Sequence, residues 1–296
     1  MAEQGDQPQI PQDVMTPQAT QEKKSKYLTI NPQEEPEAYI KKLTEASRNS
    51  LGQHYDGRDK NGNLGMGKYE GSYLDKTEHE WLTPDKMIVR YAERLLAQGT
   101  HPVTIVDFGA GEAGTLALAA VAMKNSVIER KVRFIATNLN GKPTLEDIAK
   151  APLEDRHSLR DLETCLKENL IDFKIADILE LRDMLAGQPA QLIMTQNVFP
   201  FTIKVNDFIL KTFGEMLDKD KGTIVIGNNG LQSDLRPESE ESKMEWATLN
   251  RGVQNIKDLG FEQLPYNNPL RIRTRHSGTE YTLFQAANAP RLDVMF

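Results

Sequence analysis

A glycine-rich segment at residues 105–114, Ile-Val-Asp-Phe-Gly-Ala-Gly-Glu-Ala-Gly, constrains the fold of this chain more than any other feature. It begins as a short apolar strand and leads into an alanine-rich helical pattern, with Gly109, Gly111 and Gly114 between the two. Glycine tolerates a tight turn off a strand, lets the backbone approach a ligand, and allows the following helix to pack closely. The segment therefore predicts a strand, a turn and a helix at the start of an α/β sheet.

The rest of the chain alternates between helical and extended apolar patterns. A helix is expected from Pro84 to Gly99, and further helices at residues 115–128, 144–169 with a break at Pro152, 179–185, 205–217 and 242–259. Further strands are expected at residues 132–136, 171–175, 191–195, 222–227, 261–264 and 280–285. Such alternation implies a parallel sheet with helices on both faces, and two final strands without a helix between them pair antiparallel. The predicted fold class is α/β, with a doubly wound, seven-stranded, mostly parallel sheet and a C-terminal antiparallel strand pair.

Asp107, two residues before the first glycine, indicates which kind of ligand the turn binds. Dinucleotide-binding dehydrogenases usually have an apolar residue there, because a carboxylate at the end of the strand repels a pyrophosphate. A carboxylate suits a ligand with an ammonium and a sulfonium group. The pattern Asp107-x-Gly109-x-Gly111, followed by the small residue Ala113, resembles the first motif of the class I S-adenosylmethionine-dependent methyltransferases.

The resemblance extends over about residues 84–288 and implies a Rossmann-like methyltransferase fold that binds S-adenosyl-L-methionine and methylates an unidentified acceptor. It implies that the cofactor contacts Asp107 and the turn residues Gly109, Ala110, Gly111 and Gly114. After the second strand the family usually has an acid that accepts hydrogen bonds from both ribose hydroxyls. The chain departs from the family there and offers Asn138 and Leu139, whose amide and backbone are the expected ribose contacts.

The third and fourth strands are followed by the remaining candidate site residues. The resemblance implies that Asp177 accepts a hydrogen bond from the adenine amino group and that Ile178 stacks on the ring. Asp177 is equally well placed to cap the helix that starts beside it. Gln196 and Asn197 follow the fourth strand, where the resemblance implies that they face the acceptor as the candidate catalytic residues, with Gln196 also near the cofactor.

Two segments precede the predicted catalytic domain, which spans residues 84–290. Residues 1–36 are predicted to be a disordered tail, because their prolines and polar side chains bury little apolar surface. Residues 37–83 are predicted to form a helix and then a glycine-rich segment. That segment is interpreted either as a lid over a ligand or as a plain connector.

The composition argues against several other functions. No apolar run approaches the length of about 18 residues that spans a bilayer, and no secretory signal is visible, so a cytoplasmic protein without membrane partners is expected. A net charge of −7 disfavours broad binding to nucleic acid. The five histidines show no metal-ligand spacing, and a single cysteine, Cys165, is interpreted as a buried apolar residue in a reducing compartment.

Two other functions are compatible with the sequence. Asn138 also fits a noncatalytic adenosine-binding or interaction module that has kept the fold and lost affinity. The glycine pattern by itself also occurs in NAD(P)-dependent oxidoreductases, although those would end in parallel strands. The leading hypothesis is a methyltransferase that acts on a small molecule or a protein side chain, while neither the acceptor nor the oligomeric state can be predicted.

Overall fold

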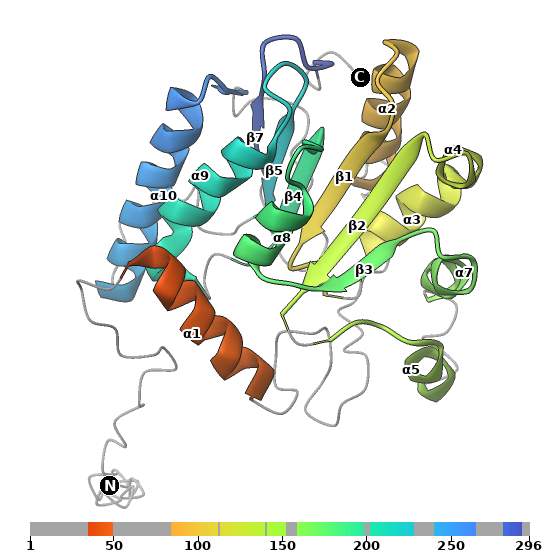
Figure 1. The fold of residues 1–296 in the computed structure, drawn as a ribbon, viewed down its shortest axis with the longest axis horizontal. Coiled ribbons are helices and arrows are strands. Elements are labelled where there is room, and N and C mark those ends of the chain that lie inside the picture. Colours follow the sequence, from red (N-terminus) through yellow and green to blue (C-terminus); the bar gives the residue numbers. More distant parts are fainter. Residues whose placement is uncertain are drawn as a thin grey trace, which may run out of the picture.

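The computed structural model describes residues 35–49, 84–111, 113–139, 141–151, 159–196, 198, 202–227, 240–264 and 281–291. Its strands are β1 (Val103–Phe108), β2 (Val132–Asn138), β3 (Asp172–Ile175), β4 (Leu192–Gln196), β5 (Thr223–Gly227), β6 (Glu262–Gln263) and β7 (Tyr281–Gln285). They form one sheet in the order β3-β2-β1-β4-β5-β7-β6 (Figure 1). Strands β1 to β5 are parallel, and β7 runs antiparallel to both β5 and β6. The predicted fold class is confirmed.

Two groups of helices cover the two faces of this sheet (Figure 1). One face packs against α2 (Pro84–Ala97), α3 (Gly114–Ala122), α4 (Lys124–Ile128), α5 (Leu145–Lys150) and α7 (Arg160–Glu168). The other face packs against α1 (Pro36–Asn49), α8 (Ile178–Met184), α9 (Asn206–Met216) and α10 (Glu240–Asp258), and the short 3-10 helix η2 (Ile203–Val205) precedes α9. Among the described helices, none is both long enough and apolar enough to cross a membrane.

The structure corrects the predicted boundaries of three elements. The helix expected at residues 115–128 is two helices, because Met123 leaves the helical conformation with φ −103° and ψ 20°. The side chain of Met123 stays in the core, so the apolar pattern runs through the break and conceals it. Helix α10 begins at Glu240, two residues before the predicted start, and β6 covers only Glu262 and Gln263 of the predicted four-residue strand.

The free thiol of Cys165 has a structural role in packing α7 against α3. Its side chain is buried, and its Sγ lies 3.5 Å from the backbone oxygen of Ala117, to which it donates. Burial, followed by the charges of Asp161 and Glu168, raises the pKa of this thiol to about 12. The thiol therefore stays protonated near neutral pH, which confirms the interpretation of Cys165 as a buried apolar residue.

Candidate functional site

Three of the predicted site residues lie on one face of the sheet at its carboxyl edge. Asp107 in β1 is paired in register with Ala136 in β2 and Met194 in β4. Side chains alternate between the two faces of a sheet, so Asn138 and Gln196, each two residues further along, lie on the same face as Asp107. The register thus brings together residues that the sequence predicted separately, and they surround the glycine turn.

The turn itself uses its glycines for two different purposes. Gly109 has φ +72°, and a Cβ on it would collide with the side chain of Val198, so this glycine is needed for packing within the protein. Gly111 has φ +57°, and a Cβ there would meet no atom of a described residue within 4 Å. Positive φ favours glycine at both positions. Open space beside the backbone is therefore found at Gly111, where a ligand contact was predicted.

The carboxylate of Asp107 is buried and has no partner among the described residues. Asp107 is 6% exposed, and no described residue donates a hydrogen bond to its carboxylate or pairs with its charge. Burial raises the pKa of this carboxyl from its usual value of 3.8 to about 7. A buried anion without compensation is unfavourable, and a cationic ligand group beside it would restore a low pKa.

The Asn138 side chain holds the glycine turn in place. Its Oδ1 accepts a hydrogen bond from the backbone N–H of Gly111 at 2.8 Å, and its Nδ2 donates to the Gly111 backbone oxygen at 2.8 Å. A side-chain amide can accept from the backbone N–H of a residue and donate to its backbone C=O at the same time, whereas a carboxylate can only accept. This pairing gives a physical reason for asparagine at the position where the family usually has an acid.

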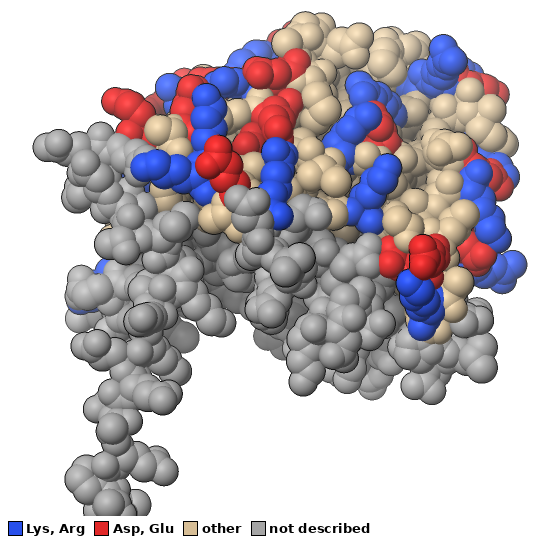
Figure 2. Space-filling model, turned by 60° about the horizontal axis from the view of Figure 1, so that its bottom comes forward, with Lys and Arg blue, Asp and Glu red and all other residues tan. Residues whose placement is uncertain are grey.

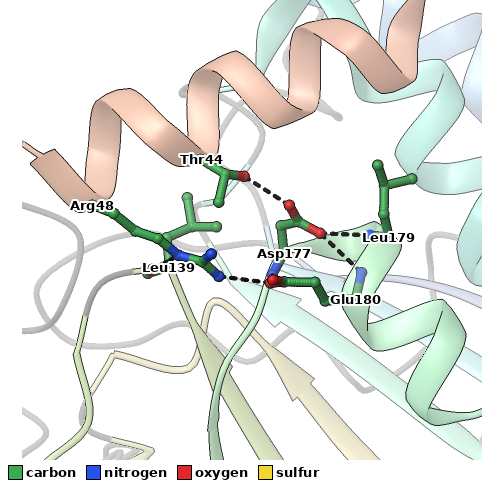
Figure 3. A network of polar contacts seen from close by, with 6 residues as sticks. All are labelled: Thr44, Arg48, Leu139, Asp177, Leu179 and Glu180. Carbon is green, nitrogen blue, oxygen red and sulfur yellow. Dashed lines mark hydrogen bonds and ion pairs between the residues drawn. The ribbon is translucent and has the colours of Figure 1, made fainter.

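Asp177 caps α8, as one of its two predicted roles required. Its Oδ1 accepts from the backbone N–H groups of Leu179 and Glu180, both at 2.9 Å, while Glu180 Oε2 accepts from the Asp177 backbone N–H at 2.9 Å. The second oxygen, Oδ2, accepts from the hydroxyl of Thr44 in α1 at 2.9 Å (Figure 3). Both carboxylate oxygens of Asp177 are therefore engaged within the protein.

Arg48 gives α1 a second point of contact with the predicted adenosine end of the site. Its guanidinium lies 2.6 Å from Glu180 Oε2, and its Nε donates to the backbone oxygen of Leu139 at 3.1 Å (Figure 3). Burial acts to raise the pKa of Glu180, but hydrogen bonds from Arg48 and the Asp177 backbone hold that pKa below its usual value. Helix α1 thus contacts the residues that follow both β2 and β3.

Ile178, the predicted stacking residue, is already covered by protein. It is 1% exposed and belongs to the core that α1 shares with α8 and α9, together with Tyr39 and Ile40. The contacts of Thr44 and Arg48 were not predicted, because helical periodicity predicts a helix at α1 but says nothing about which part of the sheet it covers.

The opposite face of the carboxyl edge carries two hydroxyls that the sequence did not single out. Thr137 in β2 and Thr195 in β4 are both in register with Phe108, so all three side chains lie on the face covered by α8 and α9. Both hydroxyls are buried, and neither has a hydrogen-bond partner in the part of the chain that the structure describes. Buried polar groups are nearly always satisfied, so these hydroxyls are candidates to bind an internal water or a polar ligand group.

The remaining predictions lie partly outside the described residues. Asn197 and the glycine-rich segment within residues 50–83 fall there. Gln196 is half-buried, and its side-chain amide hydrogen-bonds to no described residue. In the described part of the chain, no group of three or more histidine, cysteine, aspartate or glutamate side chains could hold a metal ion.

Charges of both signs alternate over the described surface next to this edge. Figure 2 views the molecule from the bottom of Figure 1, and lysine or arginine side chains lie beside aspartate or glutamate side chains across the coloured part of that face. The ion pairs of the described residues include Arg182 with Glu37 at 3.1 Å and Lys174 with Asp172 at 2.7 Å. The described surface shown there offers no extended area of a single charge.

Comparison with known proteins gives similarity of fold only. No family model and no curated protein sequence matches the chain. Among solved structures, the DszA carbon methyltransferase is 15% identical with a TM-score of 0.38, covering 70% of this chain and 54% of that one. A putative O-methyltransferase from Nostoc punctiforme PCC 73102 is 8% identical with a TM-score of 0.36, covering 69% and 58%. A chain of the fibrillarin/Nop5p complex is 16% identical with a TM-score of 0.37, covering 74% and 90%.

This chain spans little more than half the length of the first two of these proteins. The sheet of this chain has the parallel order β3-β2-β1-β4-β5, and the antiparallel strand β7 is inserted between β5 and β6. That order, with the glycine turn after β1, shows that the chain has the fold of the class I S-adenosylmethionine-dependent methyltransferases.

Proposed function

We propose that this chain binds S-adenosylmethionine at the carboxyl ends of β1, β2 and β4 and transfers its methyl group to an acceptor. The observation that supports this most is the unpaired, buried carboxylate of Asp107 beside the glycine turn. An anion in that position is unfavourable in the free protein and becomes favourable beside a cationic ligand. S-Adenosylmethionine has two cationic groups, whereas a dinucleotide would bring a pyrophosphate toward the same carboxylate.

The residues at the methionine end fit such a ligand. Asp107 would attract the ammonium and sulfonium groups, and the open side of Gly111 would leave room for the ligand against the backbone. Gln196, whose side-chain amide has no described partner, could donate or accept a hydrogen bond there. Gln196 and Asn197 are proposed to face the acceptor, which would be a small molecule or a protein side chain.

Bound S-adenosylmethionine would supply an electrophilic methyl group whose transfer is an in-line displacement at carbon. The contribution of the protein would be to align the acceptor with that methyl group and to exclude water. Asn138 would contribute by fixing the peptide of Gly111 through its two hydrogen bonds, so that the turn does not reorganise when the ligand binds. This mechanism requires no side chain to change covalently.

Titration calorimetry with S-adenosylhomocysteine tests the proposal, with NADH as the competing ligand. We expect heat of binding from S-adenosylhomocysteine and none from NADH, because only the first lacks a pyrophosphate. The absence of S-adenosylhomocysteine binding at millimolar concentration would contradict the proposal, and binding of NADH alone would support the oxidoreductase alternative.

A noncatalytic adenosine-binding module is the second candidate. The observation that favours it is that Asn138 and Asp177, two of the four predicted adenosine contacts, already bond within the protein. Incubating the protein with radiolabelled S-adenosylmethionine and a cell extract separates the two functions. Transfer of label to any component supports the enzyme, while binding without transfer supports the module.

Substitution of Gly111 by alanine is expected to weaken ligand binding more than it weakens folding. A Cβ at this position meets no atom of the described residues within 4 Å, so the positive φ of +57° is what opposes it there, at a cost of about 1 kcal/mol in the free energy of unfolding. A ligand packed against the backbone would collide with the new methyl group, and we expect its affinity to fall by about tenfold or more.

Gly99→Ala is the matched control for this prediction. Gly99 has φ +79°, and a Cβ there would likewise meet no atom within 4 Å, but this glycine lies just after α2 at the opposite edge of the sheet. Chemical unfolding should show similar losses for the two variants, and calorimetry should show weakened binding only for Gly111→Ala. Equal affinities in the two variants would mean that no ligand contacts Gly111.

A further inference from the structure

The side chains at the two ends of the proposed cofactor site differ in whether they are already bonded to, or covered by, other parts of the protein. At the methionine end, neither Asp107 nor Gln196 is hydrogen-bonded to a described residue. At the adenosine end, both oxygens of Asp177 accept hydrogen bonds from protein, and Ile178 is 1% exposed. Asp177 is itself only 5% exposed, so an adenine ring can reach its carboxylate only when the protein that covers it moves.

Helix α1 lies against Asp177 and Glu180 (Figure 3). Thr44 donates to Asp177 Oδ2 at 2.9 Å, and one helical turn later Arg48 contacts Glu180 at 2.6 Å and the Leu139 backbone oxygen at 3.1 Å. Residues four apart lie on the same side of a helix, so one side of α1 makes all these contacts. The residues contacted are those that follow β2 and β3, where ribose and adenine contacts were predicted.

The contacts along α1 differ in how firmly they hold it. Tyr39 and Ile40, near its start, are 4% and 3% exposed within the core shared with α8 and α9. Near its end, the side chains of Arg48 and Glu180 are 37% and 46% exposed, and such solvent-exposed ion pairs contribute little to stability. The hydroxyl of Thr44 donates to Asp177 Oδ2, the carboxylate oxygen that does not cap α8, so α1 lies on the side from which an adenine amino group would reach that oxygen.

We propose that the C-terminal half of α1, residues 44–48, is a latch that must leave Asp177 and Glu180 before an adenosine moiety can bind. The inference rests on the proposed function for its ligand, but the opening of the latch is a property of the free protein. A ligand that binds only the open state has an apparent affinity reduced by the fraction of molecules that are open. Loosening the latch should therefore tighten ligand binding.

Thiol labelling of a Thr44→Cys variant of the full chain measures the opening directly. Thr44 is 4% exposed, so a thiol there should react only when α1 moves away, and the native Cys165 is 0% exposed and gives little background. We expect the labelling rate to increase when S-adenosylhomocysteine is added. Slower labelling with this ligand would overturn the proposal, because it would mean that α1 closes over the ligand.

Adding Arg48→Met to this variant tests the latch without any ligand. Loss of the two contacts of Arg48 destabilises only the closed state, so it should increase the labelling rate about fivefold and lower the free energy of unfolding by the equivalent amount, about 1 kcal/mol. Lys124→Met is the matched control, because Lys124 forms a comparably exposed pair with Glu168 at 2.6 Å, away from α1. The control should label at the unmodified rate. An unchanged rate in Arg48→Met would overturn the latch.

The same substitution in the wild-type background is expected to tighten S-adenosylhomocysteine binding about fivefold by calorimetry. Weaker binding in Arg48→Met would also overturn the latch, because it would make Arg48 a ligand contact. Faster labelling in Arg48→Met without S-adenosylhomocysteine binding to any variant would support the opening of α1 and would contradict the proposed function. The failures of the two proposals are therefore distinguishable.

Discussion

Asp107→Asn is expected to stabilise the free protein and to abolish S-adenosylhomocysteine binding. A pKa raised by burial from 3.8 to about 7 means that the ionised carboxylate costs the folded state about 4 kcal/mol. The amide has no charge to bury, although it still lacks a partner, so we expect a net gain of about 2 kcal/mol at about pH 8. Binding should be lost because the charge that attracts the ligand is gone.

The stability gained by Asp107→Asn should depend on pH. The folded-state pKa of Asp107 lies above the unfolded value, so the folded state holds the proton more tightly between about pH 4 and about pH 7. The contribution of Asp107 to stability therefore falls as pH rises through that window and is constant above it. The gain from Asp107→Asn should be largest at about pH 8 and should disappear near pH 4. Urea unfolding of both proteins across this range measures it.

Asp172→Asn is the control with the opposite sign. Burial acts to raise the pKa of Asp172, but the hydrogen bonds and charges of Lys174 and Arg133 hold that pKa below its usual value. Its contribution is therefore present above the unfolded pKa and is lost as pH falls, so Asp172→Asn should destabilise the protein at neutral pH. A less stable Asp107→Asn protein at about pH 8, or one with unchanged affinity for S-adenosylhomocysteine, would contradict the assignment of Asp107.

Asn138→Asp is expected to destabilise the protein and to weaken ligand binding, although it restores the acid that the family usually has at this position. The carboxylate would lose the donor that now bonds the Gly111 backbone oxygen and would place a second acceptor against it. Asn138 is 3% exposed, so the repulsion would be poorly screened. We expect a loss of about 3 kcal/mol in the free energy of unfolding.

The alternative role for Asn138, a weak substitute for a ribose-binding acid, predicts the opposite change. In that case Asn138→Asp would strengthen S-adenosylhomocysteine binding through charge-assisted hydrogen bonds. Asn169→Asp introduces the same change at an exposed residue after α7 and controls for the added charge. Tighter binding by Asn138→Asp with unchanged stability would show that the contact with Gly111 is dispensable.

Local patterns in the sequence were sufficient for the fold and for part of the site. The glycine turn, the position of Asp107 and the cap at Asp177 each depend on residues close together in the chain, so a short segment encodes them. The helix break at Met123 could not be predicted from the apolar pattern, because the Met123 side chain continues that pattern and only its backbone conformation changes.

The contacts that decide how the site works could not be predicted in this way. Asn138 meets Gly111 only because β1 and β2 are adjacent and in a particular register, and an asparagine suits either a ribose or a peptide. Thr44 and Arg48 act through the placement of α1 over α8, which depends on tertiary packing. Sequence patterns predict which face of a helix or strand is apolar. Which faces pack together is decided by the tertiary structure, and that packing determines which polar groups remain free to bind a ligand.

The sheet ends in two strands that offer little to another chain. Outer strands with unpaired backbone groups can recruit strands from neighbouring molecules and start aggregation, and natural proteins counter this with charges or with short outer strands. Here β6 is two residues long, and β3 carries Asp172 and Lys174, joined at 2.7 Å. Both borders of the sheet thus discourage its growth from one molecule into the next.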